Sequence, residues 1–331
     1  MDDRYLWDRS GPPDPDVARL ERALSPLRHS GSAPAIPTRR RFSPLWVIAA
    51  AAALAAVAVL GGWLLRPRPT WDVARLEGSP RVGQERMGAT GKLPVGGWLE
   101  TDASSRAKVR VGAIGQVEVA PNSRVKLVKA RFTDHRLALE RGSIEAQIWA
   151  PPRLFFVETP SALAVDLGCV YSLRVDENGG GLLSVTAGWV QLTRPGRDSL
   201  VPAGASCVMR GGRGPGTPFY DDASAPFRHA LERFDFDPAP GDGLDVVLSE
   251  ARKRDALTLW HLLLRTKGSE QDRVFARFAA LIPPPPGVTL DAIRNRDDRA
   301  LELWRDELEL PWFQKEVPWW RKAWHRVWAA S

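Results

Sequence analysis

The longest apolar stretch of the chain runs from Leu45 to Leu65 without a charged residue. Such a run is about the length that an α-helix needs to cross the hydrocarbon core of a bilayer, so it predicts one transmembrane helix over residues 45–65. Trp46 and Trp63 lie near its ends, where indole rings favour the membrane interface. Two alternatives are a buried Ala-rich helix of a globular protein and a cleaved export signal that includes Arg39–Arg41.

Residues 1–44 form a polar tail before this run. In one segment, from about Asp14 to Arg28, apolar residues recur at helical spacing. These residues are Val17, Leu20, Leu24 and Leu27. So short an isolated helix is marginal in water, and we therefore expect a cytoplasmic partner to dock on this stripe. Residues 29–44 are rich in Ser, Pro and Gly, which predicts a linker.

From residue 70 to about residue 210 the pattern has a period of two. Charged and apolar residues alternate from Arg106 to Val111, and the segment from Ile144 to Ile148 repeats the alternation. This alternation places one face of each strand in a core and the other in water. Turn signals recur between the alternating segments, which predicts an antiparallel all-β sandwich or roll over residues 70–210.

After this region the pattern changes again. Residues 211–226 are rich in Gly and Pro and predict a linker, and from Phe227 apolar residues lie three or four apart. The expected helices are His229–Arg233, Leu244–Arg252, Ala256–Arg265, Asp272–Leu281 and Arg299–Glu307. The predicted fold class is therefore multidomain α+β with one transmembrane helix, in which the β region is followed by a small all-α helical bundle over residues 227–331.

The C-terminal segment combines aromatic and basic residues on one short helix. Trp320, Trp324 and Trp328 fall on one face, and Arg321, Lys322 and Arg326 occupy the rest with no acidic residue nearby. A basic helix with a tryptophan face fits membrane lipid at the bilayer interface, or a partner protein. The alternative is that the same tryptophans pack against the helical bundle.

The net charge bears on nucleic-acid binding, and the cysteine count bears on disulfides and zinc sites. The net charge of +7 is carried by scattered arginines, without a basic block interleaved with aromatic residues, so we expect no nucleic-acid partner. The chain has 2 cysteines, too few for a disulfide scaffold or a zinc site. Cys169 and Cys207 either form one disulfide in an oxidising compartment or remain two buried thiols.

Catalytic patterns are missing from the sequence. The 5 histidines lie far apart, with no His-Glu-x-x-His pair and no Gly-x-Ser-x-Gly elbow. The segment from Gly88 to Lys92 imitates the end of a phosphate-binding loop, but Leu93 replaces the Ser or Thr that would hold magnesium. We therefore expect no enzyme, no catalytic residue, no metal and no cofactor.

The β region resembles the FecR-domain family over roughly residues 80–210. The opening residues of the resemblance are Gly97, Trp98, Leu99, Glu100, Thr101, Ser105, Arg106, Ala107, Gly115, Val117, Val119, Pro121, Asn122, Ser123 and Val125. Its closing residues are Leu137, Leu139, Gly142, Phe156, Val157, Thr159, Pro160, Val165, Leu167, Gly168, Val185, Gly188 and Val190. Cys169 and Tyr171 depart from the Thr and Phe that the family usually has after Leu-Gly.

The resemblance implies a layout with a cytoplasmic anti-sigma tail, one span and a periplasmic β domain that senses a partner. It implies a single-pass protein of the bacterial inner membrane, with the N-terminus cytoplasmic and the residues after 66 extracytoplasmic. The expected function is an anti-sigma-like regulator or transducer of an envelope signal. A sigma factor would bind on the cytoplasmic side, and an envelope protein or ligand on the β domain. The alternative is an anchored scaffold or binding module without a sigma-factor partner.

Overall fold

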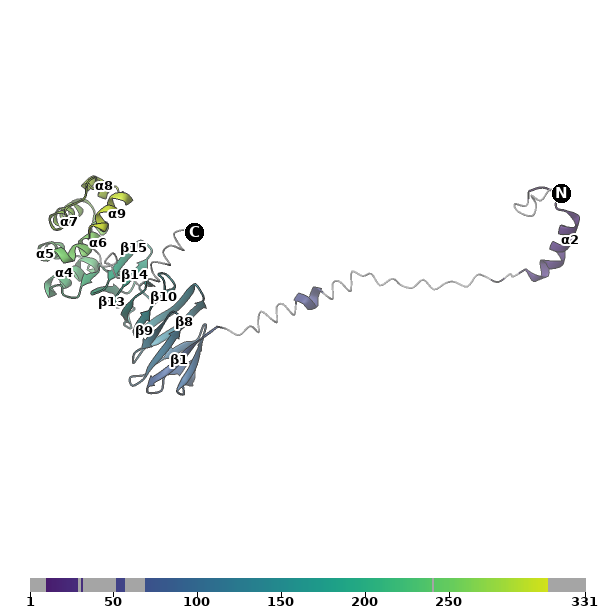
Figure 1. The fold of residues 1–331 in the computed structure, drawn as a ribbon, viewed down its shortest axis with the longest axis horizontal. Helices are drawn as coiled ribbons and strands as arrows, with labels where there is room; N and C mark the ends of the chain where they lie inside the picture. The colour runs from purple at the N-terminus through teal and green to yellow at the C-terminus, as the bar shows by residue number, and fades with distance from the viewer. Residues whose placement is uncertain (1–9, 29–30, 32–51, 57–68, 240, 309–331) are drawn as a thin grey trace. The chain divides into compact units, whose positions relative to one another are not determined.

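The computed structural model describes residues 10–28, 31, 52–56, 69–239 and 241–308 (Figure 1). The chain divides into two units, Met1–Arg66 and Pro67–Ser331, and each is described by itself. The first contains α2 (Pro15–Leu24), followed by the 3-10 turn η1 (Ser25–Leu27). Asp14 caps α2, because its Oδ1 accepts a hydrogen bond of 2.9 Å from the backbone N–H of Asp16.

The predicted transmembrane helix is corrected by the structure. Within the described residues, no helix is both long and apolar enough to cross a membrane. The longest helix described, α7 (Gly268–Leu281), has 14 residues. At about 1.5 Å per residue it spans about 21 Å, against a hydrocarbon core of about 30 Å. Of the predicted span only residues 52–56 are described, as a short helical segment. The predicted fold class and the single-pass inner-membrane localisation are therefore wrong as stated.

The second unit is mostly a curled, antiparallel β structure followed by helices (Figure 1). Its strands form two sheets that share β9 (Asp134–Ile148). The first sheet runs in the order β4 (Thr90–Pro94), β1 (Thr70–Glu77), β6 (Arg106–Val111), β7 (Gly115–Val119), β9, β12 (Val170–Val175), β13 (Gly181–Ala187) and β16 (Ala205–Arg210). The second runs in the order β3 (Glu85–Arg86), β2 (Arg81–Val82), β5 (Trp98–Glu100), β8 (Arg124–Arg131), β9, β10 (Phe155–Glu158), β11 (Leu163–Asp166), β14 (Trp189–Arg194) and β15 (Arg197–Pro202). The pairing of β10 with β9 is parallel.

The strand β9 passes from one sheet to the other at Gly142. Its first half pairs with β8 in the second sheet, and its second half pairs with β7 and β12 in the first. Gly142 has φ 94°, a conformation that favours glycine. Before this corner the odd-numbered residues are buried, as at Leu137 and Leu139, and after it the even-numbered ones are, as at Ile144. The corner thus reverses which residues face the core.

The core of the sandwich lies between the two sheets. Val109 and Val117 of the first sheet and Leu127 and Leu137 of the second are fully buried in one hydrophobic cluster. Each fully buried side chain of this kind contributes about 1.5–3 kcal/mol relative to an exposed one. The apolar residues of the alternating segments therefore stabilise the sandwich through their burial between the sheets.

The segment predicted as a linker contributes two short strands. β17 (Gly214–Pro215) and β18 (Phe219–Tyr220) both pair with β16. Gly214 has φ 85°, and Gly216 approaches the Phe236 ring so closely that a Cβ atom would come within 2.9 Å of it. The glycines of this segment therefore permit close packing in a region that composition alone predicted as a linker.

The helices of the second unit pack around their own core. They are α4 (Ala225–Phe236), α5 (Gly243–Glu250), the 3-10 turn η2 (Lys253–Asp255), α6 (Ala256–Arg265), α7, α8 (Leu290–Arg294) and α9 (Asp298–Asp306). The Trp304 ring stacks on Phe278 with 4.2 Å between ring centroids, and its Nε1 donates a hydrogen bond of 3.2 Å to the Ile282 carbonyl. This buried aromatic pair joins α7 to α9.

The helices are joined to the sandwich at the edge strand β15. The backbone N–H of Leu200 donates to Nε2 of His261, at 3.3 Å, and Nη2 of Arg265 donates to the carbonyl of Asp198, at 2.9 Å. Both side chains come from α6, four residues apart, and therefore from the same face of that helix. Helix α6 thus provides hydrogen-bond partners that a further strand would otherwise supply.

A buried ion pair reinforces this junction. The Asp235 side chain of α4 is 3% exposed and lies 3.5 Å from Nη1 of Arg265 and 2.5 Å from Nη2 of Arg197. Thr217 donates to the same carboxylate from its backbone N–H, at 2.5 Å, and from its Oγ1, at 3.0 Å. The carboxylate is therefore fully partnered, as a buried charge requires.

Candidate functional site

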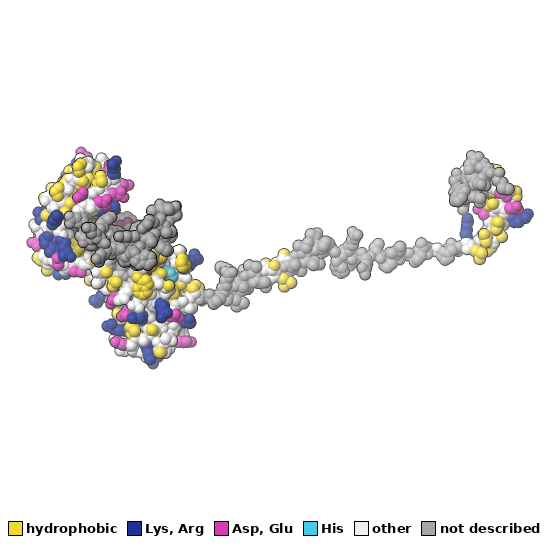
Figure 2. Space-filling model, in the orientation of Figure 1, with side chains coloured by type: hydrophobic (Ala, Val, Ile, Leu, Met, Phe, Trp, Pro, Cys, Tyr) yellow, Lys and Arg dark blue, Asp and Glu magenta, His cyan; other side chains and the backbone are white. Residues whose placement is uncertain are grey.

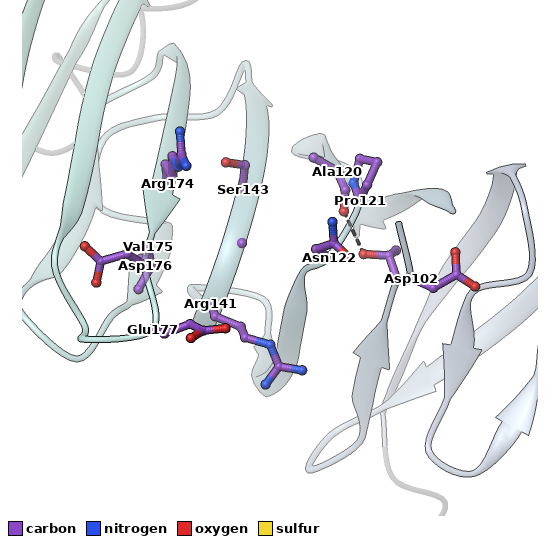
Figure 3. A pocket seen from close by; sticks show the side chains of 12 residues that line it. Asp102, Ala120, Pro121, Asn122, Arg141, Ser143, Arg174, Val175, Asp176 and Glu177 are labelled. Carbon is purple, nitrogen blue, oxygen red and sulfur yellow. Dashed lines mark hydrogen bonds between the residues drawn. The ribbon is translucent and has the colours of Figure 1, made fainter. Parts of the chain in front are cut away.

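A cleft opens at one end of the sandwich, where four connecting segments meet. Its volume is about 720 Å³. It lies between the turn after β5, the β7–β8 turn, the Gly142 corner of β9 and the turn that follows β12 (Figure 3). The rim is charged: Arg141 and Arg174 contribute guanidinium groups, and Asp102, Asp176 and Glu177 contribute carboxylates.

Hydrogen bonds between small polar side chains hold the cleft in place. Oγ1 of Thr101 donates to the Ala120 carbonyl at 2.6 Å, and the backbone N–H of Ser123 donates to Thr101 Oγ1 at 2.9 Å. The backbone N–H of Asn122 donates to the Asp102 carbonyl at 3.1 Å. Thr101 and Ser123 are both buried, so these bonds tie the β5 and β7–β8 turns together away from water.

The β9 corner is attached to the same network. The backbone N–H of Ser143 donates to Ser123 Oγ at 2.9 Å, and Ser123 Oγ donates to the Ser143 carbonyl at 3.1 Å. A Cβ atom at Gly142 would overlap both the side chain and the Cα atom of Ser123. Only glycine therefore allows the corner to approach the neighbouring turn so closely.

The carboxylates of the rim are held by local hydrogen bonds. Hydrogen bonds from Ser105 and Ser104 lower the pKa of Asp102 below its usual value, so this exposed carboxyl is ionised near neutral pH. Oδ1 of Asp176 accepts from the backbone N–H groups of Asn178 and Gly180, each at 2.9 Å. Figure 3 shows Arg141 and Glu177 on one side of the cleft, with Arg174 and Ser143 on adjacent strands.

The chemistry of the cleft suits binding. Guanidinium groups form paired hydrogen bonds with carboxylates, and the rim carboxylates can accept from cationic side chains or backbone N–H groups. The matching partners, which are carboxylates, cationic side chains and backbone N–H groups, all occur in protein segments. Within the described residues, no group of three or more His, Cys, Asp or Glu side chains is placed to hold a metal ion.

The predicted docking stripe lies on the surface of the first unit. Leu20 is 59% exposed, Leu24 54% and Leu27 78%, and Val17 is partly buried. No residue of α2 is buried, and hydrophobic side chains are visible on its surface (Figure 2). The stripe is therefore accessible in the described part of the unit.

The two cysteines are placed as separate buried thiols. Sγ of Cys169 donates to Asp166 Oδ2 at 2.7 Å, and Sγ of Cys207 donates to the Gly216 carbonyl at 3.1 Å. Cys169 lies beside Gly188, just past the end of β13, whereas Cys207 pairs with Leu183 within that strand.

This placement corresponds to the alternative of two buried thiols and explains why the structure has no bridge between them. Leu183 and Gly188 are five positions apart in sequence, which is about 16 Å along a strand at about 3.3 Å per residue. A disulfide needs α-carbons within about 4.4–6.8 Å. Burial also raises the pKa of Cys207 to about 12, so its thiol stays protonated at neutral pH.

Several functional predictions fall elsewhere. Trp320, Trp324 and Trp328, with Arg321, Lys322 and Arg326, lie outside the described residues, so their interfacial or partner role stays a prediction. The rim residues Arg141, Arg174 and Glu177 were not predicted from the sequence, because each stands among many scattered charges. The sequence did contain one signal for this site: charged rim residues stand next to turn-forming residues, at Gly142 and at the Asp176–Gly180 turn.

Comparisons with known proteins place the cleft within one family region. The sequence model of the family described as "FecR protein" matches residues 98–191, and every residue that lines the cleft lies in that range. The predicted FecR resemblance is thereby confirmed. No curated protein matches the chain.

Solved structures give a more distant likeness. Two crystal structures of a protein described as a "putative anti-sigma factor" from Parabacteroides distasonis ATCC 8503, at 1.65 Å and 2.50 Å resolution, each share 14% sequence identity with this chain and superpose with a TM-score of 0.33. The likeness covers 41% of this chain and 64% of that protein, so this chain spans less than two thirds of its length.

Proposed function

We propose that this chain, whose residues 98–191 form a FecR region, is a FecR-type regulator that works by binding other proteins rather than by catalysis. In this proposal α2 binds a sigma factor through its leucine stripe. The cleft in the FecR region receives a second protein, and its binding changes the availability of α2 to the first.

The observation that carries this proposal is the combination of the FecR match with an exposed amphipathic helix. The 10-residue helix α2 carries two leucines that are more than half exposed, and Leu27 of the following turn η1 is a third. Such an amphipathic segment gains stability when a groove on a partner buries its apolar face. Burying those leucines would contribute a few kcal/mol of the binding free energy. The charged rim of the cleft supports the proposed binding of a second protein, because its guanidinium and carboxylate groups can pair with charged groups of the opposite sign on a protein surface.

The test is binding of the full chain to a panel of purified bacterial sigma factors, measured by calorimetry. The double variant Leu20→Asp with Leu24→Asp should abolish binding, because it places two charges on the face that the partner would bury. The matched control is Arg19→Asp with Arg22→Asp, which puts the same side chains on the polar face of α2 and should retain binding.

Two results would count against the proposal. Undiminished binding by the leucine double variant would remove α2 as the docking element. Absence of binding to every sigma factor in the panel would favour the alternative function, a binding module with no sigma-factor partner.

A further inference from the structure

A groove on the outer face of the first sheet has the features of a second binding site. It crosses strands β4, β1, β6 and β7 and has a volume of about 910 Å³, within the range of about 300–1,000 Å³ that is usual for ligand sites. We call it the basic groove, defined by Lys92, Lys108, Arg110 and Trp149. Its lining shares no residue with that of the cleft, so it is independent of the proposed function.

Small residues make this sheet face hollow. The lining includes Ala74, Gly91, Gly112, Ala113 and Gly115. Ala74 faces outward from the middle of β1 and Ala113 is exposed in the β6–β7 turn, so neither brings a long side chain to cover the strands, whereas Gly91 and Gly115 stand at core-facing positions. An extended segment could therefore lie close to the backbone of the sheet.

The charge of the groove is unbalanced. Its lining carries three cationic side chains and one carboxylate, Asp72. Lys92 lies 3.2 Å from Asp72 and Lys108 lies 2.8 Å from Glu118, which stands outside the lining. Arg110 is exposed, and among the described residues no carboxylate forms an ion pair with it. Both ion pairs are accessible to water, and such pairs contribute little to stability, so the lysines can exchange their partners for a ligand at little cost.

The indole of Trp149 adds an apolar contact surface. The residue directly follows β9 and is 55% exposed, although tryptophan is on average a highly buried residue type. Its Nε1 donates to the Ala113 carbonyl at 3.3 Å, which fixes the ring at the side of the groove. A fixed, exposed indole beside cationic groups is typical of residues that dominate binding energy at interfaces.

We propose that the basic groove binds an extended acidic segment of a partner protein. Carboxylates of the segment pair with Arg110 and the two lysines, and one apolar side chain of the segment lies on the Trp149 indole. Charge complementarity selects the acidic partner, and the apolar contact distinguishes a peptide from a purely anionic polymer.

The test uses the full chain and a fluorescein-labelled decapeptide in which glutamate and leucine alternate, with binding followed by fluorescence anisotropy. Arg110→Glu should weaken binding at least tenfold, and Trp149→Ala at least fivefold. The matched controls are Arg228→Glu, an exposed arginine of α4, and Phe132→Ala, a residue that is 91% exposed at the β8–β9 turn and outside the lining. Both controls should bind within twofold of the unaltered chain.

Further arms separate the proposed ligand from other anions. A peptide with lysine in place of glutamate should not bind, and added salt should weaken the binding of the acidic peptide. Equal affinity of the Arg110→Glu and Arg228→Glu variants would overturn the proposal, because the peptide would then be attracted by the net charge of the whole chain rather than by the basic groove. Binding of heparin, without binding of the peptide, would overturn it in favour of an anionic polysaccharide.

Discussion

At the scale of single residues, Gly142 decides how the sandwich closes. It stands at the point where β9 leaves the second sheet for the first, and its backbone packs directly on Ser123. The same contact positions Arg141 and Ser143 at the cleft. The glycine of the family pattern is therefore explained by local geometry: no other residue has both the backbone freedom and the small size that this corner requires.

Replacing Gly142 by alanine tests this explanation. We expect Gly142→Ala to reduce the free energy of unfolding by about 3 kcal/mol or more, since the new methyl group adds a steric overlap to the cost of a positive φ. The control is Gly196→Ala, because Gly196 also has a positive φ, 78°, but open space around its Cα atom. That variant should lose about 1–2 kcal/mol. Urea denaturation measures both, and equal losses would contradict the overlap.

At the scale of elements, α6 protects the edge of the second sheet. His261 and Arg265 bind backbone groups of β15, and Asp235 of α4 pairs with the same arginine. Burial, together with the charge of nearby Arg265, lowers the pKa of His261 to about 3 from an ordinary value of 6.5. Its imidazole is therefore neutral, which is the form whose Nε2 can accept the Leu200 N–H.

This shift predicts a pH dependence of stability. Between pH 6.5 and about 3, the unfolded chain binds a proton at His261 that the folded chain does not. The free energy of unfolding should therefore fall as the pH decreases through this window, by up to about 1.4 kcal/mol per pH unit. His261→Gln keeps an acceptor without titrating, so its stability should fall less steeply with decreasing pH.

The matched control for this experiment is His229→Gln, which replaces an exposed histidine of α4 and should keep the slope of the unaltered chain. Urea denaturation at a series of pH values measures each slope. A His261→Gln variant with the same slope as the unaltered chain would show that the imidazole is not buried as a neutral acceptor.

At the scale of the whole molecule, the sandwich and the helices of residues 67–331 belong to one unit. A shared hydrophobic cluster joins Val165, Leu167 and Trp189 of the sandwich to Leu257 of α6. The buried charges at Asp235 and Arg265 lie at the same junction. Separation of the two parts would expose both the apolar cluster and the charges, which is unfavourable.

Native-state hydrogen exchange tests this coupling. We expect the most protected backbone amides of α6 and of β14 to exchange with the same free energy of opening, because both parts should unfold in one cooperative step. The internal comparison is α2, whose residues are unburied and whose amides should exchange at a much lower free energy. A clearly lower value for α6 than for β14 would mean that the helices open by themselves.

Several features could be predicted from local sequence patterns because their causes are local. Alternation from Arg106 to Val111 predicted a strand, and β6 spans those residues. Helical spacing predicted a helix over Ala256–Arg265, and α6 spans the same range. The order of Gly, Pro and apolar residues between Gly97 and Val190 resembled the FecR domain, and the family model matches residues 98–191. Periodicity carries this information because it records which side of each element faces the core.

Other features could not be predicted correctly from local patterns, and the structure corrected or added them. An apolar run predicted a membrane-crossing helix, and no described helix is long and apolar enough to be one. The sequence left two alternatives for the cysteines, a disulfide or two buried thiols, and in the structure strand register keeps the two thiols apart. The cleft, the basic groove and the contact of α6 with β15 are each formed by segments that lie tens of residues apart in sequence. Periodicity specifies the faces of an element, whereas partner and register follow from packing the whole chain into one core.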